Sequence, residues 1–206
     1  MKKIYLLSGL LLVMMLFILT GCSKENEQVT EEKNINFENE NVSDIDSLGD
    51  MEVDKGVFNV EITVPSEYVG EKTQEELTAL AEENGYKSVT LNEDGSATYI
   101  MSKSQHKKMM DELKESFDTS LQEMLQSEEY PSITDIKHND DYTDFTVTTS
   151  HTELDLAESF STMVFYMYGG MYAAFNDSDV DNVHVSFINS VTGEIISEAN
   201  SKDLAE

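Results

Sequence analysis

The chain has 206 residues, 41 acidic against 13 basic side chains, and a formal net charge of −28 at pH 7. All the basic residues are lysines. A chain this acidic lacks the clustered positive charge that nucleic-acid binding needs, and it is repelled by anionic lipid surfaces. The length predicts one domain, with room for a tail.

The first 21 residues have the pattern of an export signal. Lys2 and Lys3 give a positive start, and residues 4–19 are almost entirely apolar. This run is slightly short for a transmembrane helix, which needs about 20 apolar residues. We therefore interpret residues 1–21 as a signal peptide that is removed from the mature protein.

The signal ends in Leu19-Thr20-Gly21-Cys22, which resembles the lipobox of bacterial lipoproteins of the Gram-positive type. This resemblance implies that the Cys22 thiol carries diacylglycerol and that a signal peptidase cuts between Gly21 and Cys22. Two acyl chains anchor a protein stably. We expect lipidation of Cys22 to hold the protein at the extracellular face of the cell membrane. An ordinary signal peptide with a chance cysteine and an uncleaved anchor are the alternatives.

Residues 22–55 form an acidic stretch whose only aromatic residue is Phe37. Such a stretch buries too little apolar area to offset the entropy of ordering, so we predict a disordered tether. Residues 56–201 are expected to form a single domain, and residues 202–206 a short tail.

Local patterns predict the first half of this domain. Phe58–Val64 alternates apolar and polar side chains as a half-buried strand does, and Pro65 ends it. A capping box at Thr73-Gln74-Glu75-Glu76 begins a short helix that stops at Gly85. Strands at Lys87–Asn92 and Ser96–Met101 follow, joined by the hairpin signal Asp94-Gly95.

The second half repeats this order. An amphipathic helix is expected from near Ser104 to before Pro131, followed by a hairpin of strands Ile133–His138 and Tyr142–Thr149. A third helix is expected over Leu154–Phe175, with Thr152 as its N-cap. The last hairpin contains Val183, Val185 and Phe187 and turns at Thr192-Gly193.

Together these elements make one strand and three helix–hairpin units. Consecutive hairpins favour an antiparallel sheet, and amphipathic helices must cover it. The sequence therefore predicts an α+β fold with one antiparallel sheet and the helices mainly on one of its faces.

The third predicted helix is apolar almost all round, which is typical of a core helix. Small residues four apart, such as Gly169 and Ala173, allow another backbone to approach closely. Three other interpretations stay open: an aromatic pocket, an interface formed by Tyr166, Tyr168 and Tyr172, and a Cu(I) site. The copper site would use the thioethers of Met163, Met167 and Met171.

Metal ligation by oxygen or imidazole has weaker signals. Asp177–Asp181 places acids at alternate positions, as calcium loops do, but Asn182 and Ile188 replace the required glycine and glutamate. We expect His106, His138, His151 and His184 to lie on the surface, because none has a close metal-ligand spacing.

The chain carries no nucleophile, phosphate-binding or dinucleotide-binding motif, so we assign no catalytic, cofactor-binding or metal-binding residue. The part after Gly56 resembles uncharacterised, adhesin-like surface lipoproteins, a resemblance that implies no functional residue. Our leading interpretation is a non-catalytic surface module that binds a protein or a cell-surface ligand. The alternatives are an accessory envelope protein in folding, export or cell-wall assembly, and an extracellular or cell-wall-acting enzyme.

Overall fold

A computed structural model describes residues 51–205, which form two compact units. Unit 1 ends at Met109, and unit 2 begins at Met110. The predicted signal peptide, Cys22 and most of the predicted tether lie outside the described residues. Within residues 51–205, no helix combines the length and the apolar character needed to cross a membrane.

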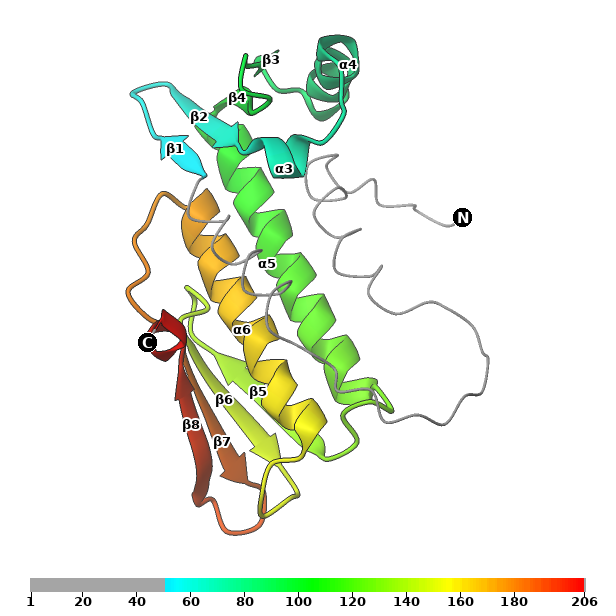
Figure 1. Ribbon diagram of the computed structural model, residues 1–206, viewed down its shortest axis with the longest axis vertical. Helices are drawn as coiled ribbons and strands as arrows, with labels where there is room; N and C mark the ends of the chain where they lie inside the picture. The colour runs from blue at the N-terminus through cyan, green and yellow to red at the C-terminus, as the bar shows by residue number, and fades with distance from the viewer. Residues whose placement is uncertain (1–50, 206) are drawn as a thin grey trace. The chain divides into compact units, whose positions relative to one another are not determined.

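Unit 1 contains a four-stranded sheet in the order β1-β2-β4-β3, antiparallel throughout (Figure 1). Its buried face includes Val60, Ile62 and Val64, the alternating apolar positions of the predicted first strand. The first strand, β1, lies within the last residues of the stretch that the sequence predicted as tether. The strands are β1 (Glu52–Asp54), β2 (Asn59–Val64), β3 (Ser88–Leu91) and β4 (Ala97–Ser102).

Unit 1 also contains α3 (Ser66–Val69) and α4 (Gln74–Asn84). The predicted capping box is confirmed, because the Thr73 hydroxyl accepts from the Glu76 amide and the Glu76 carboxylate accepts from the Thr73 amide. The helix ends at Gly85, whose φ of 69° is left-handed. The Gln74 side chain bonds to the backbone of β3, which satisfies polar groups at that sheet edge.

Helix α5 (Lys103–Gln126) begins in unit 1 and continues into unit 2. Unit 2 has a second four-stranded sheet in the order β5-β6-β7-β8, in which β6 and β7 are parallel and the outer pairs are antiparallel. A short 3₁₀ helix, η1 (Ser201–Ala205), follows the last strand. The strands are β5 (Ile133–His138), β6 (Asp144–Thr149), β7 (His184–Asn189) and β8 (Ile195–Asn200).

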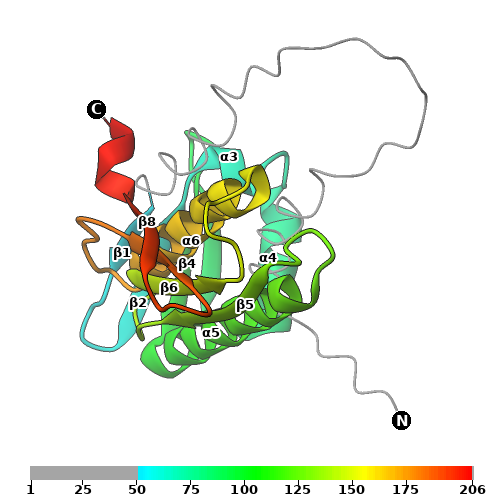
Figure 2. The same ribbon diagram turned by 90° about the horizontal axis from the view of Figure 1, so that it is seen from below.

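Helix α6 (Leu156–Phe175) connects β6 to β7 and lies along the sheet of unit 2 in both ribbon views (Figures 1 and 2). Its Phe165 ring lies 4.8 Å from the Phe145 ring of β6. Its Tyr168 ring stacks on Phe117 of α5 at 4.4 Å. The three tyrosines considered as an interface are buried, as the core interpretation of this helix predicts; they are Tyr166, Tyr168 and Tyr172.

The α+β class agrees with this architecture, but the prediction of a single antiparallel sheet is wrong. The strands form two sheets of four, and the second sheet is mixed. The physical reason lies in α6, which carries the chain from the end of β6 back to the start of β7, so that these neighbouring strands run in the same direction. Hairpin signals specify local antiparallel pairs and carry no information about pairing between hairpins.

Candidate functional site

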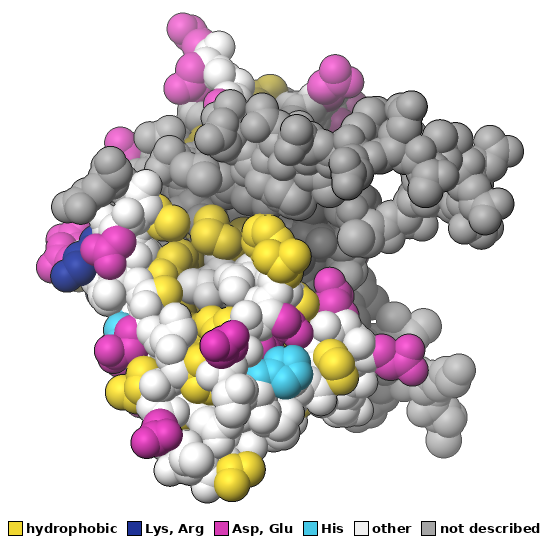
Figure 3. Space-filling view, turned by 60° about the horizontal axis from the view of Figure 1, so that its bottom comes forward, with side chains coloured by type: hydrophobic (Ala, Val, Ile, Leu, Met, Phe, Trp, Pro, Cys, Tyr) yellow, Lys and Arg dark blue, Asp and Glu magenta, His cyan; other side chains and the backbone are white. Residues whose placement is uncertain are grey.

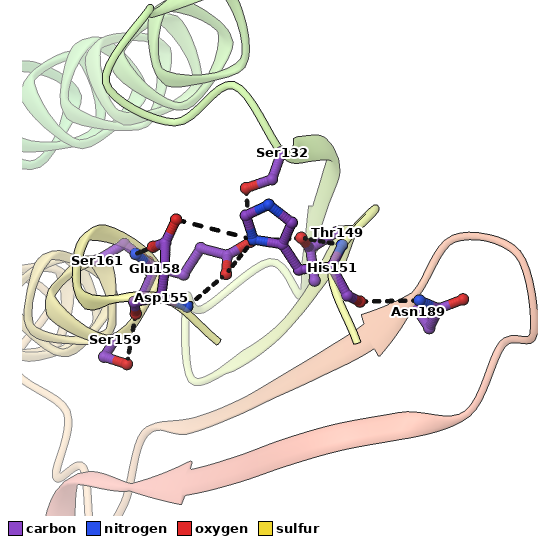
Figure 4. A network of polar contacts seen from close by, with 8 residues as sticks. All are labelled: Ser132, Thr149, His151, Asp155, Glu158, Ser159, Ser161 and Asn189. Carbon is purple, nitrogen blue, oxygen red and sulfur yellow. Dashed lines mark hydrogen bonds and ion pairs between the residues drawn. The ribbon is translucent and has the colours of Figure 1, made fainter. Parts of the chain in front are cut away.

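Buried polar side chains gather in unit 2 where β6 leads into α6 (Figure 4). Of the eight buried polar side chains in the described part of the chain, five belong to this network. Buried polar groups are costly unless they are hydrogen-bonded, so such a concentration marks a specifically built region. The five are Ser132, Thr149, Glu158, Ser161 and Asn189.

Helix α6 begins with a capping box that sequence reasoning missed. The backbone amide of Glu158 donates to Asp155 Oδ1 at 2.8 Å, and the amide of Asp155 donates to Glu158 Oε2 at 2.9 Å. The N-cap is therefore Asp155, and the prediction of Thr152 is wrong. Asp155 is the N-cap because Glu158, three residues after it, completes the reciprocal pair of hydrogen bonds.

The Glu158 carboxylate accepts four hydrogen bonds although its side chain is fully buried. Oε1 accepts from the Ser132 hydroxyl at 2.7 Å and from the Thr149 hydroxyl. Oε2 faces the amide of Asp155 and, at 3.1 Å, Nδ1 of His151. The Ser132 and Thr149 hydroxyls are buried and the Asp155 amide belongs to the N-cap, so these three hydrogen bonds favour one orientation of the carboxylate.

These contacts set the protonation of Glu158. Burial raises the pKa of its carboxyl, but hydrogen bonds from Thr149, Ser132, Asp155 and His151 outweigh burial and leave the pKa below the ordinary 4.5. The group is therefore a buried carboxylate anion at neutral pH.

His151 connects this anion to solvent. Its side chain is 44% exposed, and its Nδ1 also lies 3.7 Å from Asp155 Oδ2. The backbone around it is fixed, since its amide donates to the Thr149 hydroxyl and its carbonyl accepts from the Asn189 side chain at 2.8 Å. Asn189 in turn accepts from the amides of the β7–β8 turn. Figure 4 shows the ring directed toward both acids.

The arrangement differs from a nucleophilic triad. Ser132 donates its hydroxyl proton to Glu158 and not to His151, and it is only 3% exposed. A catalytic serine needs a hydrogen bond to the base that takes its proton. What the site does offer is a set of metal-ligating atoms from His151, Asp155 and Glu158, all within 4.8 Å of one another.

The other histidines differ in exposure, and His138 and His184 are partly exposed. His106 is 7% exposed, so the surface interpretation is wrong for it. His138 stacks on Tyr142 and its Nε2 lies 3.2 Å from Asp118 Oδ1. His184 lies in the sheet of unit 2, with each ring nitrogen near a different carboxylate.

The other candidate metal ligands named from the sequence do not form a convergent set of this kind. In residues 51–205, the one set of three convergent histidine, cysteine or acid ligands is the set at α6, and the acids of Asp177–Asp181 are not part of it. Met171 is buried, and Met163 and Met167 are partly buried.

Sequence reasoning treated Glu158 as one acid among many. One signal marked it: the capping-box spacing Asp155-x-x-Glu158. His151 precedes α6, so helical spacing does not predict its position beside the two acids.

Large apolar side chains are exposed near this network. Leu156 and Phe160 in the first turns of α6 are 76% and 48% exposed, and Val191 in the β7–β8 turn is 87% exposed. We call these three residues the α6 rim. Figure 3, which brings this end of the molecule forward, shows histidine and acidic side chains together with hydrophobic side chains around them.

In comparisons with known proteins, the chain matches no family model, no curated protein and no solved structure.

Proposed function

We propose that the chain is a lipid-anchored extracellular protein of the cell membrane, and that its described part is a non-catalytic binding module. The observation that carries the binding proposal is the combination at the start of α6. A largely buried, hydrogen-bonded polar network lies there beside the exposed apolar residues of the α6 rim.

Support for the anchor comes from the sequence. A basic start, an apolar run and Leu19-Thr20-Gly21-Cys22 occur in the order and at the distances that lipoprotein export requires. The chain contains a single cysteine, so the residue available for acylation is Cys22.

Support for binding comes from physical chemistry. Exposed leucine and phenylalanine one helical turn apart leave apolar area in water, and burial against a partner recovers about 25 cal/mol per Å² of it. Leu156 and Phe160 are spaced in this way. The hydrogen bonds that fix the adjacent loop lower the entropy cost of binding, because the surface is ordered before the partner arrives.

Site-specific photo-crosslinking on intact cells tests this proposal. A photoreactive phenylalanine analogue replaces Leu156 in one variant and Gln122, an exposed residue of α5 in the same unit, in a control variant. We expect a discrete crosslinked product from position 156 and none from position 122. Equal product patterns, or no product from either position, would contradict a binding surface at the α6 rim.

A further inference from the structure

The side chains of His151, Asp155 and Glu158 converge at a point that is open to solvent on one side. His151 and Asp155 are 44% and 45% exposed, whereas Glu158 is buried behind them. The convergent atoms are an imidazole nitrogen and one oxygen from each carboxylate. This donor set is that of a borderline divalent cation, since imidazole and carboxylate together suit zinc.

Two separations among these atoms are close to those of tetrahedral coordination. Bonds of about 2.0–2.1 Å to a tetrahedral ion place its ligand atoms roughly 3.3–3.5 Å apart. Nδ1 of His151 lies 3.1 Å from Glu158 Oε2 and 3.7 Å from Asp155 Oδ2. The ligand atoms that the three residues offer all lie within 4.8 Å of one another.

Each carboxylate is also oriented to leave one oxygen for an ion. Asp155 Oδ1 is occupied by the amide of Glu158, which leaves Oδ2 near the imidazole. Glu158 Oε1 accepts from the Ser132 and Thr149 hydroxyls, whereas Oε2 accepts one backbone hydrogen bond, from the amide of Asp155, and keeps a second lone pair on the side of the imidazole. Such outer contacts hold metal ligands in place in known metal sites.

The charges agree with this geometry. Two carboxylates with a neutral imidazole carry two negative charges, which one divalent cation balances. The positive end of the α6 dipole opposes a cation, but it amounts to about half an elementary charge.

We propose that His151, Asp155 and Glu158 bind one zinc-type divalent cation through Nδ1, Oδ2 and Oε2. The fourth coordination position faces solvent and accepts water or an oxygen or nitrogen atom of a ligand. This inference deepens the proposed binding function by naming the ligand class, and it does not depend on the membrane anchor.

Calorimetric titration of the full chain with ZnCl₂ in detergent tests the site. Every sample carries Cys22→Ser, so that no free thiol competes for zinc. Two variants remove one ligand each: His151→Gln at a half-exposed position, and Asp155→Asn, which keeps a side-chain oxygen for the N-cap bond. The matched control is His184→Gln. Nδ1 and Nε2 of His184 face different carboxylates, so the imidazole and both carboxylates cannot bind the same ion.

We expect one zinc ion per chain, with the affinity reduced at least about tenfold by His151→Gln and by Asp155→Asn and unchanged by His184→Gln. Circular dichroism without zinc should show folded protein for all variants. Equal zinc affinity in His151→Gln and its parent would overturn the proposal, as would calcium binding that exceeds zinc binding, because calcium prefers oxygen ligands alone. A negative titration with intact crosslinking at position 156 would reject the metal and leave the binding function standing.

Discussion

Nδ1 of His151 lies 3.1 Å from Oε2 of Glu158, so that a half-exposed imidazole contacts a fully buried carboxylate. Glu158 is also the N3 residue of α6, whose amide-rich first turn stabilises negative charge. The beginning of α6 and the end of β6 are therefore joined through one charged group. Loss of that charge should affect stability and not only binding.

Replacing Glu158 with Gln tests this role in chelator-treated protein. The amide cannot accept all four hydrogen bonds, so the free energy of unfolding at pH 7 should fall by on the order of 2 kcal/mol. Because the pKa of Glu158 is lowered in the folded state, its contribution is present above the ordinary 4.5 and is lost as pH falls through the folded-state pKa. The parent and Glu158→Gln should therefore converge in stability below pH 4.5, as measured by urea denaturation across pH.

The matched control is Glu76→Gln in the capping box of α4. Glu76 occupies the same N3 position, but its side chain is exposed. Replacing Glu76 should lower the free energy of unfolding at pH 7 by less than replacing Glu158, because water replaces the missing hydrogen bonds. Equal losses from Glu76→Gln and Glu158→Gln would contradict the importance of burial.

Gly169 allows α6 to approach the β5–β6 turn closely. A Cβ at this position would contact the Val183 side chain and lie 2.6 Å from the Tyr142 carbonyl oxygen. Gly169→Ala should therefore lower the free energy of unfolding by at least about 2 kcal/mol, although alanine is the better helix former.

Ser159→Ala is the control, since this residue is exposed on the same helix. It should change stability by less than about 0.5 kcal/mol. If thermal unfolding gave Gly169→Ala a midpoint at or above that of the parent, the close approach would be wrong.

Tyr99 provides a test at alkaline pH in unit 1. Burial and the neighbouring Tyr86 raise the pKa of Tyr99 from 10.0 to about 12. A raised folded-state pKa contributes stability that is present below pH 10 and is lost as pH rises toward 12. Relative to Tyr99→Phe, the parent should lose on the order of 2 kcal/mol between these limits. Parallel stability curves for the two proteins over this range would reject the burial of the hydroxyl.

Local signals predicted the elements well because they are properties of short segments. Thr73 and Glu76 satisfy each other within one helical turn, and Gly95 adopts the positive φ, 88°, that its turn requires. The division into two sheets depends on which hairpin pairs with which, and no short segment contains that information. The α6 network was missed for the same reason, because Ser132 and Asn189 reach Glu158 and His151 only after the chain has folded.

The histidines are a second example of what short sequence patterns cannot predict. Spacing alone gave His106 and His151 the same surface interpretation, but one is buried and the other lies half exposed beside two carboxylates. Burial of a polar side chain depends on partners that are distant in the sequence, so sequence patterns are poor predictors of which polar side chains are buried.

The most direct test of the account is mass spectrometry of the N-terminal peptide of protein isolated from the membranes of cells that export it. The account predicts a mature chain that begins at Cys22 and carries diacylglycerol on its thioether, whereas Cys22→Ala yields no lipidated peptide. Control peptides from the described residues should be identical in both proteins. A chain that begins upstream of Cys22, or an unmodified Cys22 peptide in the membrane fraction, would contradict the proposal of a lipid-anchored extracellular binding module.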